Sequence, residues 1–187
     1  MVGESFRLGY RVQEGIVLIR VALKAPRRVC KDRRFQQKNY SEGHMNIYVA
    51  SSWRNLLQPG IVAVLRKAGH EVYDFRNPAP GNNGFGWSQI DPNWQNWTPD
   101  EYRKSLNHEI AQRGFKYDMD ALRSCDACVL VLPSGRSASW EFGWAIGAGK
   151  RGAVIMLEKC EPELMYLGNP ILTSMDDVMD WAGLPRD

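Results

Sequence analysis

The chain has 187 residues, which is enough for one domain with a sizeable core. Its 44% hydrophobic and 24% charged residues are those of an ordinary globular protein, and no apolar run approaches the roughly 18 residues of a membrane-spanning helix. Four cysteines are few for a disulfide scaffold and no segment resembles a cleavable signal peptide, so we expect a cytoplasmic protein. Cys125 and Cys128 have C-x-x-C spacing, but the sequence offers them no His or Cys pair as partner, and we expect them in the core with no metal bound.

Charge separates the first 44 residues from the rest. They hold ten Lys or Arg and four Asp or Glu, a net charge of +6, so residues 45–187 carry −3 within the total of +3. A basic arm of this kind can bind nucleic acid. We favour a simpler interpretation, a weakly ordered extension or sequence upstream of a natural start at Met45, because strand and helix patterns alternate from Asn46 onward. We therefore expect an extension over 1–44, one domain over 45–187 and no nucleic-acid partner.

Apolar strands alternate with amphipathic helices along the rest of the chain. The expected strands are 47–50, 71–75, 127–132 and 152–157, and the expected helices are 54–68, 98–112, 116–124, one that carries Glu141, and a short one that begins at Ser174. Gly69 closes the first helix, and Thr98 and Glu101 form a capping box around a proline at the first helical position. The alternation predicts the fold class α/β: a single three-layer, doubly wound domain with a mainly parallel sheet, flavodoxin- or Rossmann-like.

The segment 134–149, SGRSASWEFGWAIGAG, joins a buried strand to a helix through a tight polar loop. In open α/β sheets, ligands bind at the carboxyl ends of the strands, and a helix N-terminus presents free N–H groups to an anion. We expect Gly135 and Ser137 to contact a phosphate or a sugar hydroxyl. Glu141 is expected in the first helical turn, where the helix dipole favours its ionised form and keeps it available as a nucleophile or base. The alternative is that Glu141 only complements the dipole and Gly135 only makes a turn.

A second polar loop, residues 50–55, follows the first strand and is expected to lie near the Glu141 loop. Ser52 can donate a hydrogen bond to an anion and Arg54 can offer a bidentate fork to phosphate. The alternative for Ser52 is helix capping. The sequence contains neither G-x-x-x-x-G-K-[ST] nor G-x-G-x-x-G, so it signals neither a nucleoside triphosphate loop nor a dinucleotide fold.

These residues together resemble the nucleoside 2-deoxyribosyltransferase-like superfamily, which includes the 2′-deoxynucleoside 5′-monophosphate N-glycosidases and the CMP N-glycosidases. The resemblance covers about residues 46–182 and rests on three spaced patterns. The matching residues are Tyr48, Ser52 and Arg54 for Y-x-x-x-S-x-R, Asp118 eight residues before Asp126, and Gly135, Ser137 and Glu141 for G-x-S-x-x-x-E. No single pattern is specific, but their joint order and spacing are.

The resemblance implies an enzyme that cleaves an N-glycosidic bond without a cofactor. Glu141 would attack C1′ of the sugar to give a covalent glycosyl enzyme, which water hydrolyses or a second base intercepts. Tyr48 is the third catalytic candidate beside Glu141 and Asp118, and Asp118 would assist proton delivery to the departing base or position the sugar. Asp120 is a nearby alternative, but by helical spacing it lies on a different face from Asp118.

One departure from the resemblance concerns the substrate. The transferases carry an acidic residue about six positions before the nucleophile, where this chain has Gly135 followed by Arg136. An uncharged loop beside Arg136 tolerates a 5′-phosphate that a carboxylate would repel, which favours a nucleotide over a nucleoside and hydrolysis over transfer. In the aromatic loop 76–97, Trp87 could stack on the nucleobase, or its aromatic residues could simply fasten the loop to the domain. Members of the resembled family are commonly dimeric, so we expect a homodimer.

Two other functions stay open from the sequence. A TIR-like domain would also place a glutamate at the edge of such a sheet and would cleave a nicotinamide dinucleotide. A sensor would bind a nucleotide without turning it over.

Overall fold

The computed structural model describes residues 10–13, 16–19 and 43–184, and the chain divides into two compact units, 1–39 and 40–187. In the first unit, β1 (Tyr10–Gln13) pairs antiparallel with β2 (Ile16–Ile19). The expected weakly ordered extension over 1–44 lies mostly outside the described residues. Among the residues that are described, no helix has the length and apolar character needed to cross a bilayer.

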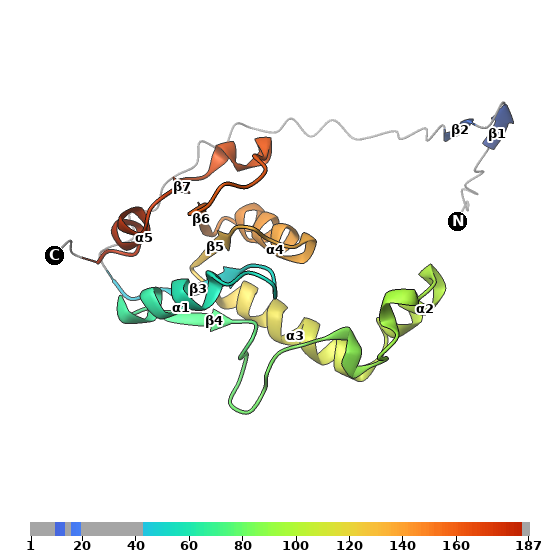
Figure 1. The fold of residues 1–187 in the computed structure, drawn as a ribbon, viewed down its shortest axis with the longest axis horizontal. Helices are drawn as coiled ribbons and strands as arrows, with labels where there is room; N and C mark the ends of the chain where they lie inside the picture. The colour runs from blue at the N-terminus through green and yellow to red at the C-terminus, as the bar shows by residue number, and fades with distance from the viewer. Residues whose placement is uncertain (1–9, 14–15, 20–42, 185–187) are drawn as a thin grey trace, which may run out of the picture. The chain divides into compact units, whose positions relative to one another are not determined.

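The second unit is built on a five-stranded parallel sheet in the order β4-β3-β5-β6-β7 (Figure 1). Its strands are β3 (Asn46–Ala50), β4 (Glu71–Asp74), β5 (Ala127–Val131), β6 (Arg151–Ile155) and β7 (Ile171–Leu172). Within this sheet the chain order is 2-1-3-4-5, which is the flavodoxin-like doubly wound order. The predicted α/β fold class is therefore confirmed, and the order reverses between β3 and β5.

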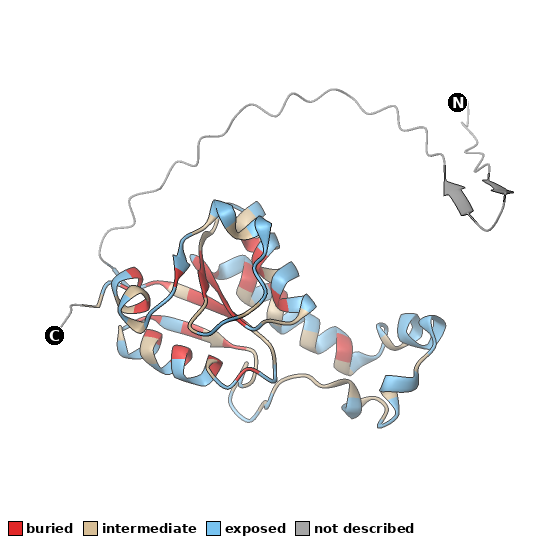
Figure 2. Cartoon of the chain, turned by 45° about the horizontal axis from the view of Figure 1, so that its top comes forward, coloured by how far each residue is buried: buried red, intermediate tan, exposed pale blue. Residues whose placement is uncertain are grey.

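Helices cover both faces of the sheet, so the unit has three layers. These helices are α1 (Gln58–Lys67), α3 (Glu109–Ser124), α4 (Arg136–Gly147) and α5 (Met175–Trp181), whereas α2 (Pro99–Ser105) buries no residue and lies away from the sheet (Figure 1). One core cluster joins α1 and α5 to one face, and the other joins α3 and α4 to the opposite face. All five residues of β5 are buried, as expected of a central strand, and Figure 2 shows the buried strands between helices with exposed outer surfaces.

The first predicted helix begins four residues too early. The structure starts α1 at Gln58, because residues 52–57 are occupied by side-chain and backbone turns. The Asn55 N–H donates to the Ser52 carbonyl at 3.0 Å, and the Asn55 Oδ1 accepts from the Leu57 N–H at 2.8 Å. These local bonds compete with the helical ladder and delay its start.

The division between the second and third predicted helices was also wrong. The Thr98 capping box is present, but α2 ends at Ser105, and α3 then runs without a break from Glu109, with the His108 side chain as its cap. Gly114, which falls between the two predicted helices 98–112 and 116–124, lies inside α3 opposite the Phe85 ring. A Cβ built there would stand 3.0 Å from the Phe85 Cβ, so the close approach of the 76–97 loop explains a glycine at this position.

Within the second unit, three short helical turns and one strand were not predicted. These are η1 (Trp87–Gln89), η2 (Trp94–Asn96), η3 (Leu164–Gly168) and β7. β7 has only two residues, which is too short for an alternating pattern to be recognised.

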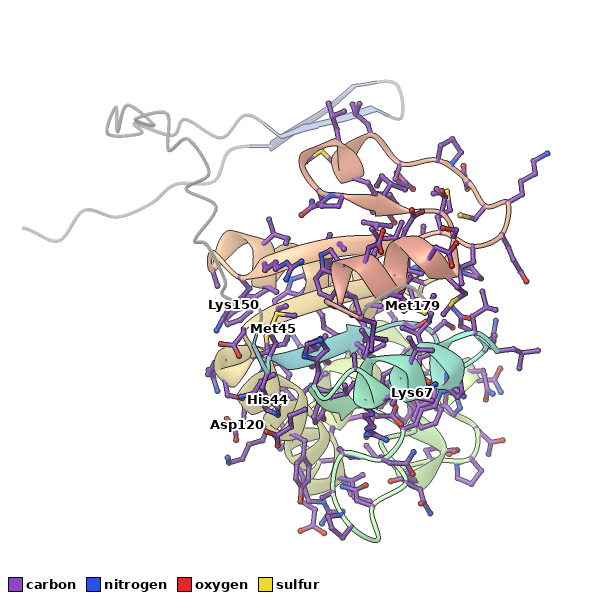
Figure 3. All side chains as sticks on the ribbon, turned by 90° about the vertical axis from the view of Figure 1, so that its left-hand side faces the viewer. His44, Met45, Lys67, Asp120, Lys150 and Met179 are labelled. Carbon is purple, nitrogen blue, oxygen red and sulfur yellow. The ribbon has the colours of Figure 1, made fainter. Side chains whose placement is uncertain are left out.

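At the amino ends of the strands, the His70 side chain links the residue before β3 to the residue after α5. Its Nδ1 accepts from the Met45 N–H at 3.2 Å, and its Nε2 lies 2.7 Å from the Ala182 carbonyl, which places the ring proton on Nε2. Figure 3 views this end of the sheet, with Met45 at the start of β3 and Lys150 directly before β6. The Lys150 ammonium donates to the Arg123 and Cys125 carbonyls, which closes the C-terminal end of α3.

Candidate active site

Two loops meet where the strand order reverses, at the carboxyl ends of β3 and β5. The Ser51 hydroxyl donates to the Val131 carbonyl at 2.9 Å. The amide nitrogen of buried Asn55 lies 3.1 Å from the same carbonyl, 3.2 Å from the Pro133 carbonyl and 3.0 Å from the Ser51 Oγ. These loops are neighbours, as predicted from the strand pattern, and the Asn55 side chain joins them.

Arg76, directly beyond β4, holds the β3 loop from its other side. Its Nη2 donates to the carbonyls of Ser52, Trp53 and Asn55 at 3.3, 2.9 and 2.8 Å. The guanidinium also lies over the Trp53 ring, 5.7 Å from its centroid. Sequence reasoning gave Arg76 no role, since an arginine in a long loop has no recognisable spacing to its carbonyl partners.

Four titratable side chains gather at this edge from four different elements. Tyr48 of β3 is fully buried and stacks on Tyr73 of β4, with ring centroids 5.0 Å apart and planes at 21°. The Tyr73 hydroxyl donates to the Asp118 Oδ1 on α3 at 2.8 Å. Glu141 of α4 completes the cluster, because its charge acts on Tyr48 and Tyr73 and that of Asp118 acts on Glu141. Tyr48, Asp118 and Glu141 are thus brought together as predicted, and Tyr73 is an addition.

The pKa of Glu141 is raised to about 7, mainly by burial and to a smaller extent by the charge of Asp118. The Tyr48 hydroxyl, which completes no hydrogen bond of ordinary geometry with any described residue, lies close enough to Glu141 to oppose this rise. The expectation that Glu141 lies in the first turn was wrong. α4 begins at Arg136, so Glu141 lies in the second turn, and burial rather than the helix dipole sets its pKa.

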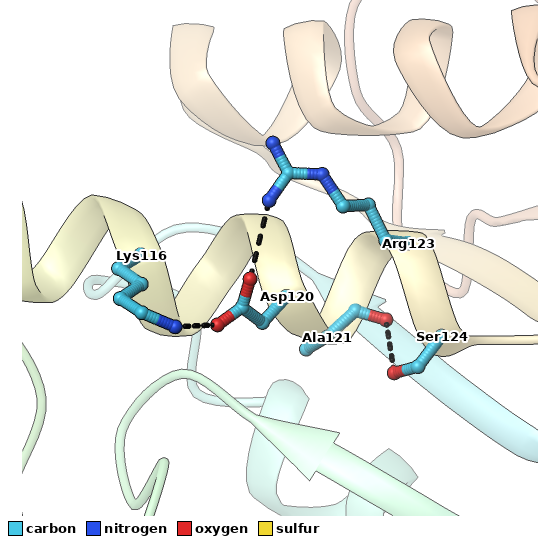
Figure 4. Close-up of polar contacts among 5 residues, drawn as sticks. All are labelled: Lys116, Asp120, Ala121, Arg123 and Ser124. Atoms are coloured by element: carbon cyan, nitrogen blue, oxygen red, sulfur yellow. Dashed lines mark hydrogen bonds and ion pairs between the residues drawn. The ribbon is translucent and has the colours of Figure 1, made fainter.

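Asp118 faces inward and Asp120 outward, as helical spacing predicted. Burial raises the pKa of Asp118, while the hydrogen bond from Tyr73 lowers it. Asp120 is exposed and pairs with Lys116 and Arg123 on the outer face of α3 (Figure 4). Its pKa is lowered, chiefly by the hydrogen bond from Lys116. Only Asp118 belongs to the cluster.

The N-terminus of α4 is open. Gly135 is its N-cap and provides no side-chain bond, and a Cβ built on Gly135 would meet nothing within 4 Å. The next residues, Arg136 and Ser137, are exposed, and no cap side chain bonds the first N–H groups of the helix. Ser52 does not cap α1, whose N-cap is Leu57; its Oγ accepts instead from the Arg54 N–H at 3.2 Å. Arg54 is exposed.

Trp87 packs among the aromatic residues of its own loop and of α2. Its ring meets Phe85, Trp97 and Tyr102 edge-on, with centroids 4.8, 5.6 and 5.6 Å apart. These contacts are the kind expected if the aromatic residues hold the 76–97 loop in place. Stacking of Trp87 on a nucleobase stays a prediction.

Cys125 and Cys128 are free, buried thiols in the α3 and α4 core cluster, as expected. Burial raises the pKa of both thiols, which keeps them protonated at neutral pH. Within the described part of the chain, no group of three His, Cys, Asp or Glu side chains could hold a metal ion.

No family model matches the chain, and no curated protein matches it. Among solved structures, the chain is similar to a 2-deoxyribosyltransferase from the psychrotolerant bacterium Bacillus psychrosaccharolyticus, described as a biocatalyst for the synthesis of antiviral and antitumoral nucleosides. The two share 20% sequence identity and a TM-score of 0.49, over 73% of this chain and 90% of that one.

Proposed function

We propose that this protein cleaves the N-glycosidic bond of a nucleoside or deoxynucleoside 5′-monophosphate, with Glu141 as the nucleophile. The observation that carries the proposal is the cluster of Glu141, Asp118 and Tyr48 at the switch point of the sheet. A carboxyl with a pKa of about 7 beside a second carboxyl and an unsatisfied buried phenol is arranged for chemistry, since a structural site would pair these groups.

The reaction would proceed in two displacements. The Glu141 carboxylate attacks C1′, a C1′–O bond forms, and the C1′–N bond breaks with its electron pair leaving on the base, which takes up a proton. Water then attacks C1′ of the glycosyl ester, loses a proton and restores the carboxylate. An acceptor base in place of water would give transfer. Asp118 either delivers the proton to the leaving base or holds a sugar hydroxyl, and the Tyr48 hydroxyl donates to Glu141 as it regains its charge.

The 5′-phosphate would bind at the open N-terminus of α4. Free N–H groups and the helix dipole favour an anion there, and Arg136 and Ser137 add a charge and a hydroxyl. Ser52 and Arg54 stand on the loop that Asn55 joins to the loop preceding α4, so they approach the same phosphate from β3. Gly135 puts no carboxylate near it, and this supports a nucleotide rather than a nucleoside substrate.

Chromatographic detection of free base tests the proposal. We would incubate the protein with ribo- and deoxyribonucleoside monophosphates, the matching nucleosides and NAD, with and without an acceptor base. Base release from a monophosphate that is lost in Glu141→Ala is the expected result, with turnover reduced by roughly three orders of magnitude or more. Glu71→Ala is the matched control, because Glu71 is an exposed glutamate at the amino end of β4, whereas the site lies at the carboxyl ends of the strands.

Each other outcome has its own meaning. Base release from NAD alone would replace the proposal with the dinucleotide hydrolase, and tight nucleotide binding without any product would replace it with the sensor. Near-native turnover in Glu141→Ala would remove Glu141 from the nucleophile's role.

A further inference from the structure

Tyr73 contacts two members of the proposed catalytic cluster, Tyr48 and Asp118, yet it belongs to none of the sequence patterns. In the parallel pairing of β3 with β4, Tyr73 stands directly opposite Tyr48. Neighbouring residues in register project from the same face of a sheet, and here both rings join the α3 and α4 side. The ring of Tyr73 therefore stacks on Tyr48 while its hydroxyl reaches Asp118 at 2.8 Å.

We propose that Tyr73 is the positioning residue of this site: its hydroxyl fixes the Asp118 carboxylate through Oδ1 and leaves Oδ2 for the substrate, while its ring sets the place of Tyr48 beside Glu141. The inference rests on the proposed function, since it assigns how that site is organised.

The hydrogen bond has a fixed direction. Burial and the nearby charges of Asp118, Glu141 and Asp74 raise the pKa of Tyr73 far above its ordinary range, so the phenol keeps its proton and remains the donor at every working pH. A donor held against a carboxyl stabilises the charged form of that carboxyl, and Asp118 accordingly has its pKa lowered by Tyr73 against the effect of burial.

The Tyr73–Asp118 hydrogen bond also separates the pKa values of the Asp118 and Glu141 carboxyls. The ionisable groups around Asp118 are Tyr48 from β3, Tyr73 from β4 and Glu141 from α4. Two neighbouring carboxyls resist losing both protons, and the group with the better donor ionises first. Tyr73 therefore makes Asp118 the first to ionise, so that Asp118 is already charged when Glu141 acts as the nucleophile. Asp118 then holds a sugar hydroxyl rather than delivering a proton to the base.

Tyr73→Phe tests the role, since it removes the hydroxyl and keeps the ring that stacks on Tyr48. The matched control is Tyr117→Phe, one residue from Asp118 on α3 but 37% exposed. The readouts are the titration of the Asp118 carboxyl by 13C NMR, with its resonance identified by its absence in Asp118→Asn, and the split between kcat and KM for the best monophosphate.

In Tyr73→Phe we expect the Asp118 midpoint to move up by about one to two pH units, as loss of one hydrogen bond to a carboxylate implies. We expect kcat to fall roughly tenfold to a hundredfold with KM changed much less, because misplacement of a group that acts in the transition state lowers kcat. Tyr117→Phe should change neither.

An unmoved Asp118 midpoint, or an equal kcat loss in Tyr117→Phe, would overturn the inference. If the native protein releases no base from any substrate, the proposed function fails, and the NMR titration still decides whether Tyr73 controls Asp118. Should Tyr73→Phe not fold, the Tyr73 Cζ resonance in the native protein is followed instead. It must shift with the ionisation of Asp118 and lose that shift in Asp118→Asn; a resonance indifferent to Asp118 contradicts the assignment.

Discussion

At the scale of single residues, four carboxyl and phenol groups distant in sequence form one cluster, and its chemistry is set by burial. The family resemblance named Tyr48, Asp118 and Glu141 together as catalytic candidates, and only Glu141 was also placed at a sheet edge by the strand pattern. Sequence patterns could not predict Tyr73, whose place beside Asp118 depends on the register between β3 and β4. They also gave the wrong cause for the state of Glu141, since the dipole argument depends on where α4 begins.

The pKa of Glu141 predicts the pH dependence of turnover. A nucleophile must be ionised, and burial raises the pKa of this carboxyl to about 7. We expect kcat/KM for the monophosphate to rise about tenfold per pH unit below pH 7 and to level off above it. Rates measured from pH 5 to 9 check this. A profile that is flat down to pH 5 would show that a group with an ordinary carboxyl pKa does the chemistry.

The same shift predicts a pH-dependent gain in stability for Glu141→Gln. Since the folded-state pKa lies above the ordinary value of 4.5, the stability linked to the protonated carboxyl is complete below pH 4.5 and is lost as pH rises through about 7. Removing the charge should therefore raise Tm at pH 8.5 by several degrees, and much less at pH 5. Thermal unfolding at both values measures it; an equal change at both would mean that Glu141 is not destabilised by burial when charged.

At the scale of elements, the buried strands were predictable and the boundaries around the 50–58 and 105–116 segments were not. A short run such as 127–132, apolar throughout and flanked by Asp126 and Pro133, is typical of a central strand. The late start of α1 follows from bonds of the Asn55 side chain and backbone, and α3 continues through Gly114, against which Phe85 packs closely. Both depend on particular contacts that helix propensity does not contain.

Arg76→Ala should weaken phosphate recognition more than chemistry. The guanidinium donates to three carbonyls of the loop that carries Ser52 and Arg54, so its loss frees that loop while the carboxyl cluster keeps its own contacts. We expect KM for the monophosphate to rise roughly tenfold or more with a smaller change in kcat. Arg103→Ala is the control, because Arg103 is 76% exposed and pairs only at the surface with Asp100. Equal effects on nucleoside and nucleotide would contradict this role.

Two glycines of neighbouring helices should respond oppositely to alanine. Gly143 lies inside α4 with nothing within 4 Å of a built Cβ, so Gly143→Ala should stabilise the protein by about 0.5–1 kcal/mol through helix propensity. Gly114→Ala should destabilise by about 1 kcal/mol or more, because Phe85 is held edge-on against Trp87 and cannot withdraw freely. Urea unfolding of both variants measures the difference, and a gain at Gly114 would show that the loop gives way.

At the scale of the whole molecule, the alternation of strands and helices predicted the layers, and the strand order added the position of the site. The sequence contains no record of which strands are neighbours, so the reversal between β3 and β5 came from the structure. The single chain also exposes an apolar surface on η3. We define this η3 surface as Leu164, Met165 and Leu167, which are 81%, 84% and 87% exposed. Such a surface is expensive in water and suits an interface.

We expect the protein to be a homodimer, and Leu167→Asp, which puts a charge on the η3 surface, should shift it toward monomer. Analytical ultracentrifugation of the native protein and the variant measures this, with Leu56→Asp as control, because Leu56 is 90% exposed outside that surface. A native protein that sediments as a monomer at tens of micromolar would contradict the expectation.

The Asn55 amide has two hydrogens and three oxygen neighbours within hydrogen-bond distance, spread over both loops of the switch point. The consequence is mechanical. The loop after β3 and the loop after β5 are held together by these contacts, so we expect the two loops to move as one unit.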